Sequence, residues 1–248
     1  MKRSKSFQKT LFFLATILLT TQIQAQSWFS NKVKGNGNVT TITRTTSDYD
    51  AIACAGSMDF ILVEGQEGKI TLEGESNLLE HIVTKVKNNT LIVKVEKGVN
   101  ISESYNKTIK ITIPYKDIQK VSLTGSGDLW NTNTISENHL EVDLTGSGDV
   151  ILDIDTNNVS GSVTGSGDVT LKGKTTNLEA SVTGSGDFNG NHLQAENTEV
   201  TVTGSGDAEV VSTETLKARV SGSGDIEYSG NPKKEDTKVA GSGSISSN

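Results

Sequence analysis

The fold of this 248-residue chain is decided by the stretch Val163-Thr164-Gly165-Ser166-Gly167-Asp168-Val169, whose Gly-Ser-Gly-Asp core occurs six times. Successive copies start 18 to 21 residues apart. A fixed period near 20 residues is typical of stacked repeats, so the second half is predicted to be a solenoid. The six copies begin at Gly125, Gly146, Gly165, Gly184, Gly204 and Gly222, and a seventh copy without the acid is Gly241-Ser242-Gly243-Ser244.

Short alternating segments flank each copy. Apolar residues fall at alternate positions before the motif, as at Ala180 and Val182, and again after it, as at Val169 and Leu171. A period of two is the pattern of a half-buried strand. Each unit is therefore predicted to hold two short strands, one on each side of the motif. A second, more variable polar turn such as Thr175-Thr176-Asn177 would close the coil.

Two strands and two turns make one coil of a β-solenoid. Coils stack at the usual strand spacing of ~4.8 Å, so each inward side chain should lie on its counterpart in the next coil. A flexible Gly-Ser linker would have neither fixed spacing nor flanking alternation. The register therefore predicts one buried column made of Val163, Val182, Val202 and Val220.

The motif itself is interpreted as a structural corner. Glycine adopts positive φ without steric cost, and Ser and Asp side chains bond to free backbone groups in turns. We expect each aspartate to cap its own turn and face water. The expected corner residues are Gly125, Gly127, Asp128, Gly146, Gly148, Asp149, Gly165, Gly167, Asp168, Gly184, Gly186, Asp187, Gly204, Gly206, Asp207, Gly222, Gly224 and Asp225.

The row of aspartates also suggests calcium as an alternative. Stacked carboxylates repel one another, and a hard cation with oxygen ligands would relieve that repulsion. The calcium-loaded β-rolls differ from this chain because their aspartates occur at another offset within nonapeptide repeats. One aspartate per coil supplies few of the oxygens that calcium needs. A calcium-stabilised repeat stays the alternative, and no residue is assigned to a metal or cofactor.

The first 25 residues have the layout of a secretory signal peptide. A cationic start with Lys2, Arg3, Lys5 and Lys9 precedes the apolar run Leu11 to Leu19, and Ala25 occupies the cleavage position. This run is shorter than the ~20 residues that span a bilayer. The chain is predicted to be exported to the periplasm, the outer-membrane surface or the medium, with no integral membrane segment after signal removal.

Charge excludes one class of partner. Removal of residues 1–25 takes away four basic residues and no acid, which changes the net charge from −7 to −11. Phosphate binding needs clustered Lys and Arg, so nucleic acid is not an expected partner.

The rest of the chain is predicted to be all-β. Residues 26–47 form a polar lead-in of uncertain order, and 48–248 form a single solenoid domain that is irregular over 48–120 and regular over 121–248. One short helix is expected from Ser76 to Thr84, with Asn77 as its cap. Cys54, the only cysteine, is expected to pack as a small hydrophobe.

No catalytic constellation is visible. The three histidines, His81, His139 and His192, fall at unrelated phases of the repeat. Polysaccharide-active enzymes do use solenoids, but here only fold analogy supports that function, so it ranks lowest. Glycan contact without catalysis usually uses aromatic platforms. Phe188 falls on an inward phase, whereas Trp130 falls on an outward phase and is the candidate contact residue.

Two further segments complete a resemblance. Together with the Val-Thr-Gly-Ser-Gly-Asp-Val repeat, Phe60-Ile61-Leu62-Val63-Glu64-Gly65 and Val121-Ser122-Leu123-Thr124-Gly125 resemble the family of the putative auto-transporter adhesin, head GIN domain. The resemblance covers Tyr49 to the C-terminus. It implies a right-handed parallel β-solenoid similar to pectin-lyase folds but without their catalytic residues, common in the Bacteroidota and with an adhesion role.

The sequence thus predicts a non-enzymatic envelope or cell-surface solenoid that acts as an adhesion or binding scaffold. Its partner would be a protein or glycan. The last coil leaves a strand edge through which a solenoid end could pair with a second copy. Pro232 and the charged run Lys233-Lys234-Glu235-Asp236 are expected in the connection before that coil, where they would blunt the edge.

Overall fold

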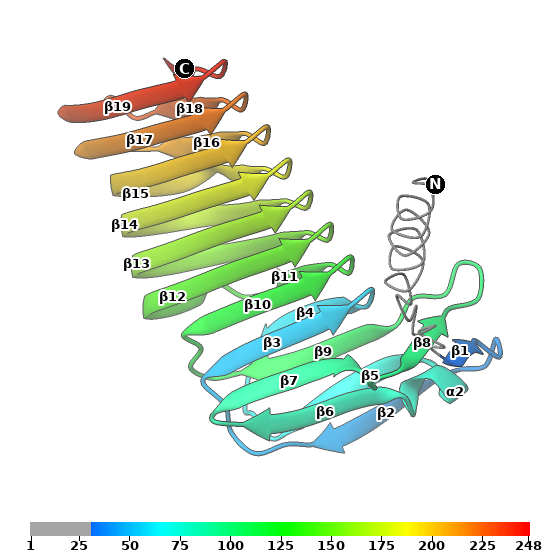
Figure 1. Ribbon diagram of the computed structural model, residues 1–248. Helices are drawn as coiled ribbons and strands as arrows, with labels where there is room; N and C mark the ends of the chain where they lie inside the picture. The colour runs from blue at the N-terminus through cyan, green and yellow to red at the C-terminus, as the bar shows by residue number, and fades with distance from the viewer. Residues whose placement is uncertain (1–30) are drawn as a thin grey trace, which may run out of the picture.

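The computed structural model describes residues 31–248, which form an almost continuous stack of strands (Figure 1). The predicted signal peptide and residues 26–30 of the lead-in lie outside the described residues. In Figure 1 the irregular N-terminal part lies at one end of the stack and the C-terminal coil at the other. The turns that follow the strand arrows line up along one side, as expected for a solenoid of repeated coils.

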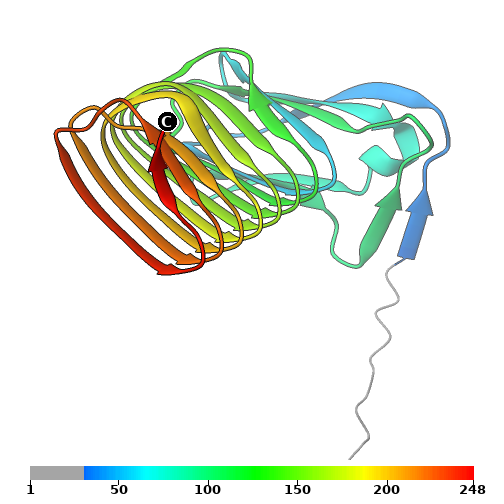
Figure 2. The ribbon, with the colours of Figure 1, turned by 90° about the horizontal axis from the view of Figure 1, so that it is seen from above.

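Each coil contributes to two faces, which we call the pre-corner and post-corner faces after their place relative to the Gly-Ser-Gly-Asp corner. On the pre-corner face each strand pairs in parallel with the next. The order of the strands is β7 (Thr90–Val95), β3 (Ala51–Gly56), β10 (Lys120–Gly125), the second halves of β12 (Ile135–Gly146), β13 (Val150–Gly165), β14 (Val169–Gly184) and β15 (Phe188–Gly204), then β17 (Thr215–Gly222) and β19 (Lys234–Gly241). On the post-corner face each strand also pairs in parallel with the next. The order there is β9 (Lys110–Tyr115), β4 (Asp59–Glu64), β11 (Leu129–Asn131), the first halves of β13, β14 and β15, then β16 (Ala208–Val211), β18 (Ile226–Ser229) and β20 (Ile245–Ser247). Figure 2 looks along the stack and shows the coils overlapping around one core.

The second turn of each middle coil differs from the prediction. β13, β14 and β15 run without a break from one corner to the next, over 16, 16 and 17 residues. Pairing continues from Thr156–Thr175 to Asn158–Asn177, and only the one residue between them on each strand is left out. The prediction of two separate strands is therefore wrong for these coils. A bend that every coil repeats does not interrupt the ladder between them.

The predicted core column is confirmed. Val163, Val182, Val202 and Val220 are in register and each is at most 2% exposed. Phe188 is also fully buried, as its inward phase predicted. Its ring occupies space that two glycines leave free, since a Cβ added to Gly161 would lie 2.5 Å from the ring. A Cβ added to Gly190 would lie 3.0 Å from it.

Both glycines of the corner are required, for different reasons. The first glycine of each of the seven copies has φ between 125° and 139°, a region that L side chains rarely adopt. The second glycine allows a close approach of backbones: a Cβ on Gly186 would lie 2.0 Å from the carbonyl oxygen of Gly167 in the preceding coil. The spacing of the motif thus follows from steric contact between successive corners.

Backbone hydrogen bonds complete this contact. The N–H groups of Ser185 and Gly186 both donate to the carbonyl oxygen of Gly165, at 2.8 and 3.0 Å. In the opposite direction, the N–H of Val169 donates to the carbonyl oxygen of Asp187 at 3.0 Å. The same bonds recur at the other corners. A corner stacked between two others is shielded from water, so its backbone groups need partners in the protein. These bonds supply them for most of the turn.

The N-terminal part is less regular because it brings in antiparallel strands. β2 (Val39–Thr45) pairs with β5 (Lys69–Glu75), β5 with β9, and β6 (Ile82–Lys87) with β7, all antiparallel. β1 (Asn31–Lys34) pairs in parallel with β8 (Val99–Ser102). Part of the polar lead-in is thus built into the fold as β1 and β2. These strands cover the first coils and close that end of the stack (Figure 1).

The predicted helix is much shorter than expected. α2 covers only Ser76–Leu79, follows Glu75 as its N-cap residue, and has no side-chain cap. Asn77 is not the cap: its amide donates to the carbonyl oxygen of Lys34 at 2.8 Å and accepts from the N–H of Asn36 at 3.0 Å. The residues that follow form β6, because their β-branched side chains favour a strand.

A buried carboxylate holds the loops of this part together. Glu75 is 1% exposed and accepts hydrogen bonds from the N–H and hydroxyl of Ser104, at 2.8 and 2.6 Å, and from the N–H of Gly37 at 2.5 Å. The bonds from Ser104, followed by that from Gly37, hold the pKa of the Glu75 carboxyl below its ordinary value of 4.5. The charged form is therefore the one that the fold stabilises.

The last coil carries polar residues at core positions. Glu235 and Thr237 of β19 are in register with the buried Leu216 and Ala218 of the coil before. The Tyr228 hydroxyl donates to the Glu235 carboxylate at 3.0 Å. The charged run expected in a connection instead lies mostly within β19, which begins at Lys234. Inward-pointing charge opposes strand addition, so this coil forms a polar end to the stack.

Replacing Gly186 by Ala should destabilise the solenoid by about 1–3 kcal/mol, because the new methyl group would meet backbone that cannot move without separating two coils. Ser185→Ala is the matched control, since Ser185 is exposed and its change should stay within about 0.5 kcal/mol. Urea unfolding followed by circular dichroism measures both. Equal midpoints for the two variants would contradict the steric argument.

Replacing Glu75 by Gln should lower the free energy of unfolding at neutral pH by about 1–3 kcal/mol, because charged hydrogen bonds are lost. The folded pKa is lowered, so this stability is present above the unfolded pKa and is lost as pH falls through the folded pKa. The difference between wild type and Glu75→Gln should thus be constant above about pH 5 and shrink below about pH 4. A difference that does not depend on pH would refute the assignment.

Making the last coil apolar should cause self-association. The double variant Glu235→Leu/Thr237→Val would extend the core columns to the end of the stack and leave an apolar edge open to a second copy. Light scattering after size exclusion should show species larger than the monomer at rising concentration. Lys238→Leu adds an apolar residue on the outward side of the same strand and should not associate in this way. Association of both variants to the same extent would argue against the polar end.

Candidate functional site

The corner aspartates form a column of hydrogen bonds between coils. The N–H of Asp187 donates to the Asp168 carboxylate at 2.9 Å, and the N–H of Asp207 donates to the Asp187 carboxylate at 2.8 Å. The bond recurs from Asp149 to Asp225. The expectation that each aspartate caps its own turn is therefore wrong: each carboxylate bonds to the backbone of the next coil. The physical reason is that the backbone N–H of each corner aspartate has no partner within its own turn, so it takes the carboxylate of the preceding coil as its acceptor.

This column ends at the last coil. There Ser244 takes the place of aspartate, and both its N–H and its hydroxyl donate to the Asp225 carboxylate, at 2.6 and 2.9 Å. These hydrogen bonds give the recurring aspartate a structural role between coils. Across residues 31–248, no group of three or more His, Cys, Asp or Glu side chains is arranged to hold a metal ion.

One corner was not predicted from the sequence. Gly56 has φ 131° and is in register with Gly125, so Gly56-Ser57-Met58-Asp59 is a degenerate copy in which buried Met58 replaces the second glycine. The N–H groups of Ser126 and Gly127 donate to the Gly56 carbonyl oxygen, both at 3.0 Å. A search for Gly-Ser-x-Asp between alternating strands would have found it.

Burial affects the ionisation of two groups near this first corner. It raises the pKa of the Asp59 carboxyl, and the neighbouring Asp128 carboxylate adds to the effect. It also raises the pKa of the Cys54 thiol, which is 2% exposed in the core. A thiol with a raised pKa is a poor nucleophile, which agrees with the predicted packing role.

The three histidines lie apart. His81 faces the Glu96 carboxylate at 3.5 Å in the N-terminal part. His139 is in register with Asn158 near the bend of β12, and His192 is in register with Lys172 on β15. The structure brings no pair of them together, in keeping with their unrelated phases in the sequence.

Trp130, the predicted contact residue, lies on the outside of the post-corner face. It is half-buried and in register with Ile61 of β4 and Ile151 of β13. Ile151 is 45% exposed. Trp130 and Ile151 border a cleft of about 400 Å³, which Asp153 and Lys172 also line. We call this the Trp130 cleft. An apolar floor with a few charged groups at its edge is typical of a ligand site.

One side chain holds the cleft rigid. The Asn131 amide donates to the carbonyl oxygen of Asp153 at 2.8 Å and accepts from the N–H of Asp153 at 2.9 Å, so it continues the ladder beyond β11. It also donates to the carbonyl oxygen of Asn133 at 2.9 Å. The opposite charges of Asp153 and Lys172 lie in register on neighbouring strands, and both residues line the cleft.

The neighbours of Trp130 were not predicted from the sequence. The signal is present, because Val150-Ile151-Leu152 is a run of three apolar residues that breaks the alternation and places Ile151 outside. Asp153 and Lys172 then follow at the next outward position of neighbouring coils.

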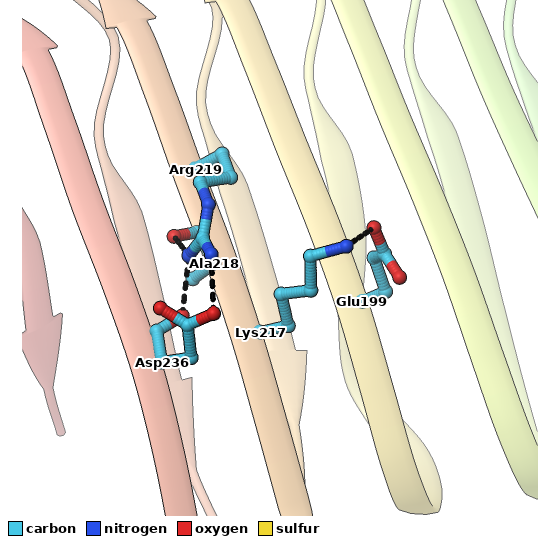
Figure 3. A network of polar contacts seen from close by, with 5 residues as sticks. All are labelled: Glu199, Lys217, Ala218, Arg219 and Asp236. Atoms are coloured by element: carbon cyan, nitrogen blue, oxygen red, sulfur yellow. Dashed lines mark hydrogen bonds and ion pairs between the residues drawn. The ribbon is translucent and has the colours of Figure 1, made fainter.

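The pre-corner face carries charged pairs that bridge successive coils near its C-terminal end (Figure 3). Lys217 pairs with Glu199, and Arg219 binds both the carboxylate and, at 2.6 Å, the carbonyl oxygen of Asp236. The hydrogen bond from Arg219 holds the pKa of the Asp236 carboxyl below its usual range. Exposed pairs of this kind are screened by water and salt and contribute little to stability. They satisfy surface charge rather than form a site.

The part of the chain that the structure describes contains no helix of the length and apolarity needed to cross a membrane.

Known proteins share this fold over most of its length. A crystal structure of a putative adhesin from Bacteroides fragilis is similar with a TM-score of 0.82 at 23% identity, over 87% of this chain and 100% of that one. A putative lipid binding protein from Parabacteroides distasonis has a TM-score of 0.73 at 27% identity, over 88% and 99%. A putative adhesin from Parabacteroides merdae has a TM-score of 0.70 at 22% identity, over 88% and 99%.

No curated protein matches the chain. The family model described as putative auto-transporter adhesin, head GIN domain, matches residues 48–232. This match covers the irregular part and all six complete Gly-Ser-Gly-Asp corners. The chain therefore belongs to the family of the putative auto-transporter adhesin, head GIN domain.

Proposed function

We propose that this protein is an exported, non-enzymatic binding protein of the cell envelope or surface, whose solenoid presents the Trp130 cleft to a glycan. Residues 1–25 would serve as the export signal, and 48–248 would form the single solenoid domain. The family description and the names of the similar structures support an adhesive role. The periplasm, the outer-membrane surface and the medium are all compatible with it.

The observation that carries the proposal is the outward pair of Trp130 and Ile151 on a rigid sheet. An indole ring offers a flat apolar surface against which the C–H face of a sugar ring packs. Asp153 and Lys172 beside it supply an acceptor and a donor for hydroxyl groups. Strands that are hydrogen-bonded on both sides hold these groups in place, so little entropy is lost on binding.

Nothing in the cleft resembles a catalytic pair. Asp153 is the one carboxylate among its lining residues, whereas glycoside hydrolysis needs two flanking the bond. Binding without cleavage is the function that this set of side chains supports.

Trp130→Ala should weaken glycan binding about tenfold, which corresponds to ~1.4 kcal/mol. Binding of the purified mature protein to a panel of envelope and host-surface polysaccharides, followed by tryptophan fluorescence and calorimetry, measures the loss. Trp130→Phe should keep most of the affinity because the ring is retained.

Tyr105→Ala is the matched control, since Tyr105 is 92% exposed and is not a lining residue of the cleft. It should bind like wild type. If Trp130→Ala also binds like wild type, or if a product of polysaccharide cleavage appears, the proposed function is wrong.

A further inference from the structure

A second hollow follows the outer bend of the middle coils, at the start of the pre-corner face. It measures about 550 Å³ and crosses successive strands from β12 to β17. Its lining residues include His139, Asn158, Asn177, Asn197, Glu179 and Glu199. We call it the asparagine groove. It shares no lining residue with the Trp130 cleft.

The floor of the groove is a column of side-chain amides. Asn158, Asn177 and Asn197 are in register, between His139 at one end and Thr215 at the other. Asn177 donates to the Asn158 amide oxygen at 2.9 Å, and Asn197 donates to the Asn177 amide oxygen at 3.0 Å. The Thr215 hydroxyl donates to the Asn197 amide oxygen at 2.7 Å. The orientation of every amide is thereby fixed.

This column leaves regular binding capacity unused. An asparagine amide has two N–H donors and two acceptor lone pairs. One of each is used in the column, where Asn158 donates to the carbonyl oxygen of Asn138 and Asn177 and Asn197 donate to the preceding amide. One donor and one acceptor therefore remain in each coil and repeat along the groove at the strand spacing of about 4.8 Å. Glu179 and Ser160 add outward polar groups beside the same coils.

The spacing of the free amide groups along the groove favours one class of ligand over others. A peptide laid along the groove would present equivalent groups every two residues, about 6.6 Å apart, and would lose step with the amides. Nucleic acid would bring phosphates against Glu179 and Glu199 in a chain of net charge −7. A neutral sugar unit carries several hydroxyls, each able to donate and accept, and so can meet one amide per coil.

We propose that the asparagine groove is a second binding site, which takes a linear neutral polysaccharide lying along the solenoid axis across successive coils. Asn158, Asn177 and Asn197 would bind its hydroxyls through the free donor and acceptor of each amide. The amide ladder also stabilises the stack, and this role supports the site because the amides are already ordered before the ligand arrives.

The test uses the mature protein with soluble linear β-glucan and linear mannan as probes, measured by calorimetry. Ser160→Trp should fill the groove without replacing any member of the amide ladder and lower affinity at least tenfold. Ser162→Trp is its matched control: Ser162 points outward two residues further along the same strand but does not line the groove, so affinity should be unchanged.

Asn177→Thr tests the amide directly. Thr occupies the same position in the coil of Thr215, so the fold accepts it, while the free amide N–H is removed. It should lower affinity several-fold with circular dichroism unchanged. Ser160→Trp made in a Trp130→Ala background, where the Trp130 cleft no longer contributes, should cause the same fold loss as in wild type, which separates the inference from the function proposed for that cleft.

Two results would overturn the inference. One is the absence of measurable binding of either polysaccharide to wild type. The other is equal affinity of Ser160→Trp, Ser162→Trp and wild type, even if Asn177→Thr lowers the unfolding midpoint, since the amide column would then serve stability alone.

Discussion

The close contact between successive corner backbones is the constraint on which the structure depends. One glycine carbonyl accepts two N–H groups from the next coil, and any side chain at either glycine would fall about 2 Å from that backbone. Each corner can therefore stack on the one before in only one register. The strands on both faces inherit that register, and the columns of Val, Asp and Asn side chains follow from it.

Regular columns mean that most outward residues serve the stack before they serve a ligand. The aspartates bond to the next backbone, and the charged pairs on the pre-corner face neutralise one another across coils. A binding site then needs either a residue that breaks its column, as Trp130 and Ile151 do, or a column with bonding capacity left over, as in the asparagine groove. Both proposed sites lie on strands that are hydrogen-bonded on both sides.

The strand edges at the two ends of the stack also have to be kept from pairing with other chains. At the start, antiparallel strands and the loops held by Glu75 cover the first coils. At the end, Glu235 and Thr237 stand in register with the buried Leu216 and Ala218, while Val239 continues the valine column and is 42% exposed. The two ends solve the same problem by different means: one adds covering structure and the other changes side chains.

Period and alternation are local properties of the chain, so the solenoid, its coil length, the inward Val column, the burial of Phe188 and Cys54, and the outward position of Trp130 could all be predicted before the fold was known. The partners of each polar group became visible only in the folded chain. The aspartates bond between coils and the bend is part of a continuous strand because those bonds join residues some 19 positions apart. The antiparallel end, the short α2 and the neighbours of Trp130 likewise depend on contacts between distant segments, which no local pattern records.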